Sequence, residues 1–160
     1  METKYFINVQ TSKRGSINEV GGKNKFFVAN YFKMFGNRME SEIFRTYDEA
    51  YKFLKKEGYC LAENLKEELY EEIELAVREN AEERDIVDAY WGNICFFPES
   101  YAGLIDVEFD VLWAERDEDR ETNYRETHYL VQVTKIWRWE KGDKVALIFD
   151  RERLEIRGEY

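Results

Sequence analysis

Residues 105–113 read Ile-Asp-Val-Glu-Phe-Asp-Val-Leu-Trp, a stretch in which apolar and acidic side chains alternate. A period of two is typical of a β-strand with one buried face and one face toward solvent. Similar stretches follow at 127–139 and 144–149, separated by the turn residues Lys141-Gly-Asp143. A turn this short joins antiparallel neighbours. We therefore expect an antiparallel β-meander within residues 93–160.

The amino-terminal part of the chain predicts a second group of strands. Residues 4–10 alternate, and residues 25–35 are rich in aromatic and β-branched side chains. The dipeptide Gly36-Asn37 is a hairpin signal and leads into a return strand at 38–45. These features predict a β-hairpin before the first helix.

Two helices are expected between the two groups of strands. Thr46 and Glu49 have the spacing of a capping box, and Gly58 supplies the left-handed residue that ends a helix. A longer helix is expected within residues 59–92, because apolar residues recur there at helical spacing. They are Leu65, Leu69, Ile73, Ala76 and Val77, and the stripe continues at Val87 and Trp91.

The composition predicts one folded α+β domain. Of 160 residues 44% are hydrophobic and 16% aromatic, which excludes disordered and collagen-like chains. No apolar stretch approaches the roughly 18 residues of a membrane span, and the first residues lack a signal-peptide core. Cys60 and Cys95 are too few for a disulfide framework, so we expect a cytoplasmic protein. The expected order within this single domain is a basic hairpin and helix (1–58), an acidic helix (59–92) and an antiparallel sheet (93–160).

Charge is unevenly distributed along the chain. Residues 1–58 carry a net charge of +4, residues 59–134 carry −15, and residues 135–160 carry +1, which gives the total of −10. Nucleic acid is a poor direct partner for the acidic segment, because phosphate binding needs Lys and Arg. The complementary partner is a basic protein surface.

The expected acidic helix has two interpretations. Residues 63–88 hold eleven acidic residues against three basic ones. Glutamates four positions apart, such as Glu67 and Glu71, cost a helix about 0.2–0.5 kcal/mol per pair. A solvated face rich in helix-forming glutamate is the ordinary interpretation. A surface that recognises a partner is the alternative.

A row of carboxylates on the strand at 105–113 is the second candidate site. Alternation places Asp106, Glu108 and Asp110 on one face about 7 Å apart, opposite a face that carries Val107, Phe109, Val111 and Trp113. This spacing is too wide for one ion unless other strands add ligands. Outward polar residues, an acidic patch continuous with a polar loop at 115–126, and a metal site all fit the pattern.

The single histidine and the carboxy-terminal aromatic residues are further candidates. His128 could pair with Cys95 as a thiol dyad, but an ordinary strand histidine is the simpler interpretation. Tyr129, Trp137 and Trp139 share a predicted strand face, as core residues or as an interface. The sequence has no nucleophile elbow, phosphate loop or zinc-finger spacing. We therefore expect no catalytic residue, no metal and no cofactor.

Two acidic stretches give the chain its resemblance to a class of proteins. They are Glu63-Asn-Leu-Lys-Glu-Glu-Leu-Tyr-Glu-Glu72 and Glu115-Arg-Asp-Glu-Asp-Arg-Glu121. In these stretches, its size and its lack of a catalytic motif, the chain resembles the small acidic anti-CRISPR and anti-restriction proteins of phages and mobile elements. The resemblance implies a non-enzymatic inhibitor that occupies the basic surface of a nucleic-acid-handling enzyme, such as a CRISPR or restriction nuclease, without binding nucleic acid or membrane directly. It resembles toxin-neutralising immunity proteins equally.

The residues expected to bind the partner are carboxylates from both candidate regions and from the polar loop. A small metal-dependent enzyme or ligand-binding domain that uses Asp106, Glu108 and Asp110 is the alternative function. The expected partner-binding residues are Glu63, Glu67, Glu71, Glu74, Asp106, Glu108, Asp110, Asp117, Glu118 and Asp119.

Overall fold

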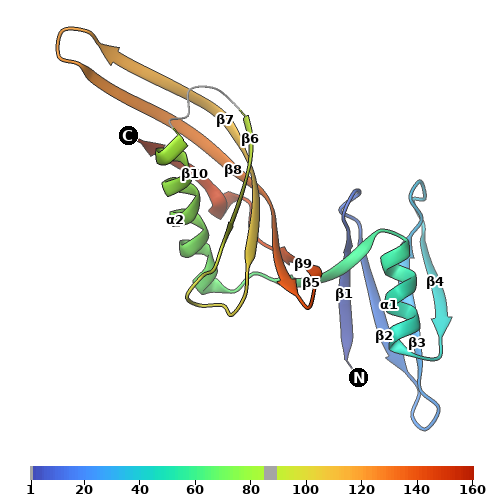
Figure 1. Cartoon of the computed structure of the whole chain (residues 1–160). Helices are drawn as coiled ribbons and strands as arrows, with labels where there is room; N and C mark the ends of the chain where they lie inside the picture. Colours follow the sequence, from blue (N-terminus) through green and yellow to red (C-terminus); the bar gives the residue numbers. More distant parts are fainter. Residues whose placement is uncertain (1, 85–89) are drawn as a thin grey trace. The chain divides into compact units, whose positions relative to one another are not determined.

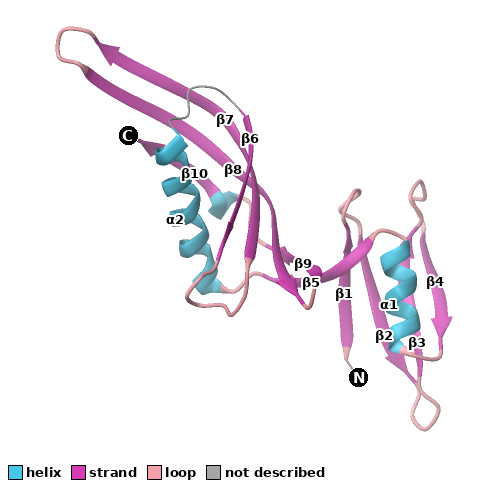
Figure 2. Ribbon diagram, in the orientation of Figure 1, coloured by secondary structure: helices cyan, strands magenta, loops and turns pink. Residues whose placement is uncertain are grey.

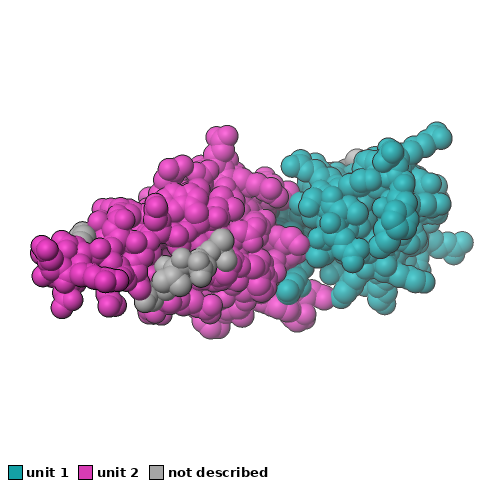
Figure 3. All heavy atoms as spheres, turned by 90° about the horizontal axis from the view of Figure 1, so that it is seen from above, with its two compact units in different colours: residues 1–63, 144–146 teal, residues 64–143, 147–160 magenta. Residues whose placement is uncertain are grey.

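The chain divides into two compact units. The computed structural model describes residues 2–84 and 90–160, with the backbone alone at Tyr124. Unit 1 comprises residues 1–63 and 144–146, and unit 2 comprises residues 64–143 and 147–160 (Figure 3). Compact units can unfold together or separately, so the single domain expected from the sequence stays a prediction.

Unit 1 is an antiparallel sheet with one helix on it. The order of its strands is β4-β3-β2-β1-β5, and each neighbour for which the register is given is antiparallel. The helix α1 lies between β4 and β5 in the chain (Figure 1). The bounds are β1 Thr3–Asn8, β2 Arg14–Val20, β3 Phe26–Phe32, β4 Met39–Phe44, α1 Tyr47–Lys56 and β5 Tyr59–Asn64.

The predicted N-cap of α1 at Thr46 and its end at Gly58 are confirmed, while the return contact of the Glu49 side chain stays a prediction. The Thr46 hydroxyl accepts a hydrogen bond from the backbone N–H of Glu49 at 3.2 Å, and Gly58 has a φ of +92° just after the helix. Ala50 and Leu54 lie one turn apart on the buried face of α1. They pack against a core that the sheet supplies, namely Phe6, Ile17, Ala29, Tyr31 and Tyr59.

Unit 2 is also an antiparallel sheet with one long helix. β6, β7 and β8 are antiparallel neighbours, and β10 pairs with β8. The helix α2 lies beside this sheet (Figure 1), and its stripe of Leu69, Ile73, Val77 and Ala81 is buried in the same core as the strands. The bounds are α2 Glu67–Arg84, β6 Tyr90–Phe96, β7 Ile105–Asp119, β8 Tyr124–Glu140, a 3-10 helix at Glu152–Leu154 and β10 Glu155–Glu159, and β9 at Asp143–Ile148 contributes residues 144–146 to unit 1 and the rest to unit 2. Across the residues described, neither α1 nor α2 is long and apolar enough to cross a membrane.

The predicted fold class is wrong. Strands make up 53% and helices 20% of the structure, with two α-helices and a ten-stranded sheet in the described residues (Figure 2). The strand order is β4-β3-β2-β1-β5-β9-β8-β7-β6, with β10 paired to β8, so the last strands are not a separate meander. Sheet is therefore the dominant structure in both halves of the chain.

The long acidic helix predicted for residues 59–92 is wrong for a local reason. Residues 59–64 form β5, in which Tyr59 is buried and pairs with Asn8 of β1. The helix begins only at Glu67 and ends at Arg84, although Leu65 is buried in the same core as the helical stripe. The expected continuation at Val87 lies outside the described residues, and Trp91 belongs to β6.

Two bulges between β7 and β8 change which side chains face the core. The register shifts between Glu108 and Phe109 and again between Val111 and Trp113. A bulge adds one residue to one strand and thereby reverses the alternation beyond it. Trp113, predicted on the core face, is consequently 41% exposed. Of the candidate aromatic residues, Tyr129 and Trp137 are buried and Trp139 is 37% exposed.

Candidate functional site: the acidic arm of unit 2

The distal part of the β7–β8 hairpin forms a two-stranded arm. Among the described residues, β6 pairs with β7 as far as Val111, and the chain beyond β10 pairs with β8 as far as Thr127. The ribbon continues from there to a turn in which Asn123 has a φ of +57°. In Figure 1 this part of the hairpin extends beyond α2 and β6. The segment 115–126, predicted as a polar loop, is therefore mostly strand.

The pairing of β7 with β8 sorts the charges of the arm onto two faces. Residues directly opposite each other on paired strands share a face. Asp117 lies opposite Glu126, and Glu115 lies opposite His128. With Asp119, two residues further along β7, these carboxylates form what we call the acidic face: Glu115, Asp117, Asp119 and Glu126.

The opposite face of the arm carries the arginines. Arg116 lies opposite Thr127, and its Nε donates a hydrogen bond to the Thr127 hydroxyl at 3.5 Å. Glu118 lies opposite Arg125, and its carboxylate is 3.9 Å from Arg116. Three formal charges on this face sum to +1, whereas the acidic face sums to −4. A stretch of mixed charge in the sequence thus becomes a ribbon with two different sides.

The four carboxylates of the acidic face are close enough for their electric fields to add. Cross-strand neighbours are about 4.5–5.5 Å apart, and residues two apart on one strand are about 7 Å apart. Both spacings are below the Debye length of about 8 Å at physiological ionic strength, so the fields of the four carboxylates add. Like charges directly opposite each other, here Asp117 and Glu126, destabilise a hairpin. Folding alone gives no reason for this pairing.

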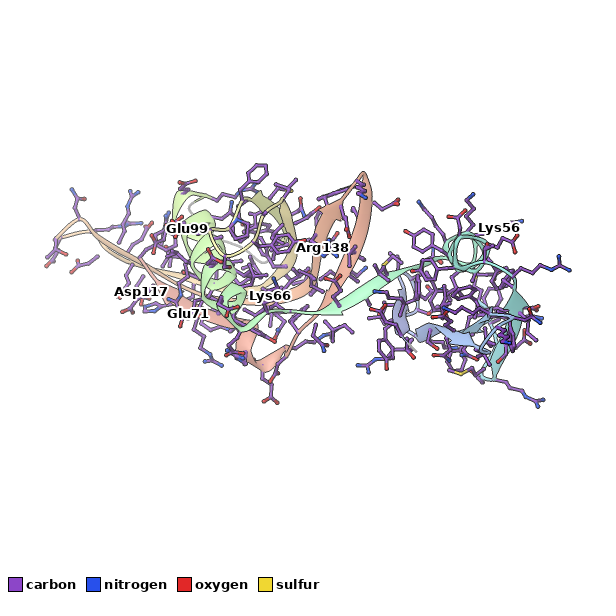
Figure 4. All side chains as sticks on the ribbon, turned by 90° about the horizontal axis from the view of Figure 1, so that it is seen from below. Lys56, Lys66, Glu71, Glu99, Asp117 and Arg138 are labelled. Carbon is purple, nitrogen blue, oxygen red and sulfur yellow. The ribbon has the colours of Figure 1, made fainter. Side chains whose placement is uncertain are left out.

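The carboxylates predicted on the acidic helix do not gather on one surface. Glu63 lies in unit 1 at the end of β5. Glu74 is paired with Arg78 at 3.0 Å, and both oxygens of Glu67 accept hydrogen bonds from Arg153 at 2.6 and 3.0 Å. Glu71 is exposed on α2, where Figure 4 labels it together with Asp117 of the arm. Arginines therefore offset part of the helix charge.

The ion pair between Glu67 and Arg153 shifts the pKa of both groups, and a stacking contact with Tyr70 adds to it. The hydrogen bonds from Arg153 lower the pKa of the Glu67 carboxyl, and the same contact raises the pKa of the Arg153 guanidinium. The guanidinium also lies 3.8 Å from the centre of the Tyr70 ring. Such planar stacking on an aromatic ring suits arginine. Glu67 thus ties the start of α2 to the 3-10 helix before β10.

The carboxylates of the β7 row have structural partners. Asp106 is only 8% exposed and accepts a hydrogen bond from the Asn93 side chain. A Glu108 oxygen accepts a hydrogen bond from the Trp137 indole at 3.3 Å. Asp110 is half-buried and lies opposite Trp91 and Gln132. Among the described residues, the acidic and histidine side chains that come close enough to share an ion lie elsewhere, on the arm.

Three of the predicted partner-binding residues lie on the arm. The thiol dyad considered for Cys95 and His128 does not form. Asp117 and Asp119 are on the acidic face, and Glu118 is on the opposite face. Cys95 pairs with Asp106 of β7, whereas His128 pairs with Glu115, nine residues further along that strand. At about 3.4 Å per residue this separation is about 30 Å, which excludes a thiol dyad.

Sequence reasoning missed Glu115, Glu126 and His128 as parts of one site. The segment 115–126 is predicted as a polar loop because nine of its twelve residues are charged, six acidic and three arginine, so the sequence gives little sign of strand pairing there. The available signal was Asn123, a residue that tolerates positive φ and can mark a turn between strands. Pairing the flanking residues around this turn brings the acidic residues together.

Comparison of the chain with protein-family models, with curated proteins and with solved structures returned no match. Function is therefore inferred from the residues of the site.

Proposed function

We propose that this protein is a non-enzymatic inhibitor whose acidic face binds the basic nucleic-acid-binding surface of a cytoplasmic nuclease of the CRISPR or restriction type. The observation that carries the proposal is the pairing of Asp117 with Glu126 on a face that also holds Glu115 and Asp119. Four carboxylates on one side of a ribbon, with arginines on the other, form a directional negative surface. A surface that binds phosphates is its electrostatic complement.

The net charge of unit 2 as a whole has the same sign as the acidic face. This unit has twelve Lys and Arg against twenty-six Asp and Glu, a net charge of −14. Such a field increases the rate at which a basic partner arrives, and the charges near the contact then decide how it docks. Because exposed charges are screened by salt, the association is expected to be fast at low ionic strength and slower at high ionic strength.

The existing ion pairs also favour the acidic face of the arm over α2 as the surface that binds the partner. Glu67 and Glu74 already have arginine partners, so a basic enzyme would have to displace Arg153 or Arg78 to use them. On the acidic face, the ion-pair partner described for Asp117 and Glu126 is His128, which is charged only when protonated. The acidic face is therefore the carboxylate cluster more available to a new partner.

The test is inhibition of DNA cleavage by a CRISPR effector nuclease and by a restriction endonuclease, with a matched pair of variants. Glu115→Lys reverses one charge on the acidic face, and Glu118→Lys makes the same change three residues away on the opposite face. We expect Glu115→Lys to slow association about threefold or more and to reduce its salt dependence, because charges at the contact act mainly on encounter. Glu118→Lys should behave like the wild-type chain.

Competition between duplex DNA and this protein tests which surface of the nuclease is bound. Duplex DNA added before the protein should prevent binding, because both would occupy the same basic groove. Equal effects of the two variants would contradict the acidic face as the binding surface. Failure to bind either class of nuclease, or binding that DNA does not weaken, would contradict the proposed function.

A further inference from the structure

The one histidine of the chain is surrounded by carboxylates. His128 Nε2 is 3.6 Å from an oxygen of Asp117 and 3.6 Å from an oxygen of Glu126. On the other side of the ring, Nδ1 is 3.5 Å from an oxygen of Glu159 in β10. Three strands thus supply one small cluster, with the imidazole at its centre. The described residues contain one such group of three side chains able to share an ion, namely Asp117, Glu126 and His128.

The two ring nitrogens of His128 have different roles in this arrangement. In a neutral imidazole one nitrogen carries the proton and the other offers a lone pair. Glu159 is placed to accept the Nδ1 proton, which leaves the Nε2 lone pair directed toward Asp117 and Glu126. A lone pair facing two carboxylate oxygens is repulsive unless a proton or a metal cation lies between them.

We infer that Asp117, Glu126 and His128 bind a divalent transition-metal ion, with Zn²⁺ as the best fit. Tetrahedral bonds of about 2.0–2.1 Å hold ligand atoms about 3.4 Å apart. The two separations from Nε2 are 3.6 Å, and all three ligand atoms lie within 4.8 Å of one another. The two separations from Nε2 are therefore close to those of a tetrahedral site, and the carboxylate oxygens have to approach each other when the ion binds.

The chemistry of the ligands points to the same class of ion. Imidazole favours zinc and its neighbours, whereas Mg²⁺ prefers an all-oxygen set. A carboxylate that accepts the other ring N–H, the position of Glu159, is the usual support of a metal-bound histidine. Glu159 is therefore a positioning residue of the site.

Metal binding at this site does not depend on whether the arm binds a nuclease. Three protein ligands leave at least one coordination position for water or for a group from another molecule. Asp117, with its side chain 70% exposed, places that position at the surface of the arm. The test below measures metal binding alone, so its result is independent of any nuclease assay.

Calorimetric titration of the metal-free protein with Zn²⁺, Mn²⁺ or Mg²⁺ tests the site. We expect one Zn²⁺ to bind at least about tenfold more tightly than Mn²⁺ or Mg²⁺. The single imidazole gives one set of histidine NMR signals, which should shift on addition of Zn²⁺ and report binding at Nε2 directly. Melting curves of every variant confirm that the fold is retained.

Matched variants separate a metal site from general attraction to negative charge. Glu126→Gln removes a ligand and Glu118→Gln removes the same charge from the opposite face. We expect Glu126→Gln and His128→Asn to weaken Zn²⁺ binding by about tenfold or more, Glu159→Gln by about tenfold, and Glu118→Gln by less than about twofold.

Three results would overturn the inference. The first is no heat and no shift of the His128 signals at about 1 mM Zn²⁺, a concentration that corresponds to only about 4 kcal/mol of binding free energy. The second is Zn²⁺ binding that leaves the His128 signals unchanged, which would place the ion elsewhere. The third is an equal loss of affinity in Glu126→Gln and Glu118→Gln, which would show attraction by charge alone.

Discussion

The two units of this protein follow the same plan and carry opposite charge. Each is an antiparallel sheet with one helix that buries an i, i+4 stripe, Ala50 and Leu54 in unit 1 and Leu69 to Ala81 in unit 2. Unit 1 has twelve basic residues against eight acidic ones, a net charge of +4, whereas unit 2 has a net charge of −14. The same plan of sheet and helix is therefore compatible with a basic surface and with an acidic one.

The two helices differ in the same way in the charges of their first and last turns. α1 has Asp48 and Glu49 in its first turn and Lys55 and Lys56 in its last, the arrangement that complements the helix dipole. α2 has glutamates along most of its length, and its last turn has a single arginine, Arg84. Unit 1 thus follows the rules of helix stability closely, while unit 2 departs from them in the direction of negative charge.

The largest expected effect compares the two cores. All four tryptophans lie in unit 2, so tryptophan fluorescence reports its unfolding directly. Phe109 is 1% exposed, and Phe109→Ala should lower the free energy of unfolding by about 3–5 kcal/mol in urea titrations followed by fluorescence. Leu112→Ala, at a neighbouring side chain that is 50% exposed, is the control and should change it by less than about 1 kcal/mol.

The counterpart in unit 1 tests whether the units are one cooperative domain. Leu54 is fully buried, and Leu54→Ala should cost about 2–5 kcal/mol. If the chain is the single domain expected from its sequence, this change shifts the tryptophan transition of unit 2 as well, and circular dichroism gives the same midpoint. A tryptophan transition that stays in place while the dichroism transition moves would contradict the single domain.

A smaller effect is expected where a glycine makes room for an aromatic ring. Gly92 of β6 lies opposite Phe109 of β7, and a Cβ on Gly92 would overlap the ring. Gly92→Ala should therefore destabilise the protein by about 1–3 kcal/mol, measured by urea titration. Gly22 of unit 1 has open space around its Cα, so Gly22→Ala should be neutral or slightly stabilising. Equal effects at the two sites would show that the Phe109 ring can move aside.

The smallest expected effect concerns the pH dependence of unit 2. Because Arg153 lowers the pKa of Glu67, the unfolded state binds a proton at this carboxyl at a higher pH than the folded state does. The ion pair therefore stabilises the fold above the ordinary glutamate pKa of about 4.3, and the contribution is lost as the pH falls below it. Glu67→Gln should lower the fluorescence-detected urea midpoint at neutral pH, and this effect should shrink as the pH falls through the folded-state pKa of Glu67.

Glu71→Gln is the control for this last comparison. Glu71 lies one turn further along α2 and is exposed. The hydrogen bonds from Arg153 go to Glu67, so the substitution of Glu71 should not reproduce the lowered urea midpoint at neutral pH. A pH dependence equal to that of Glu67→Gln would show that the general repulsion among the glutamates of α2, rather than the contact with Arg153, controls acid stability.

Local signals in the sequence predicted single elements better than their assembly. The cap at Thr46, the end at Gly58 and the alternation of residues 105–111 are each decided by neighbours in the chain, and the structure contains all three. The strand at Tyr59 depends on pairing with β1, about fifty residues earlier. No local pattern reveals such a distant partner, so the apolar spacing around it resembled the start of a helix.

The candidate site was partly predictable for a related reason. Counting charges located the acidic segment, but the faces depend on the register of β7 with β8, which a single bulge shifts by one residue. Trp113 was predicted on the core face and is 41% exposed, whereas the role predicted for Glu118 in partner binding stays a prediction. Asp106 was selected as a surface carboxylate, yet Asn93 on the neighbouring strand covers it.

Residues 144–146 of β9 belong to unit 1, although the 80 residues of Asn64–Asp143 separate them from its other strands. During translation, at about 5–20 residues per second, this separation corresponds to a delay of about 4–16 s. Until β9 emerges from the ribosome, β5 lacks its neighbour on one side and has an open edge, which is a site for mispairing with other nascent chains. The amino-terminal unit is thus completed after most of the carboxy-terminal one has been synthesised, so the order of assembly differs from the order of the sequence.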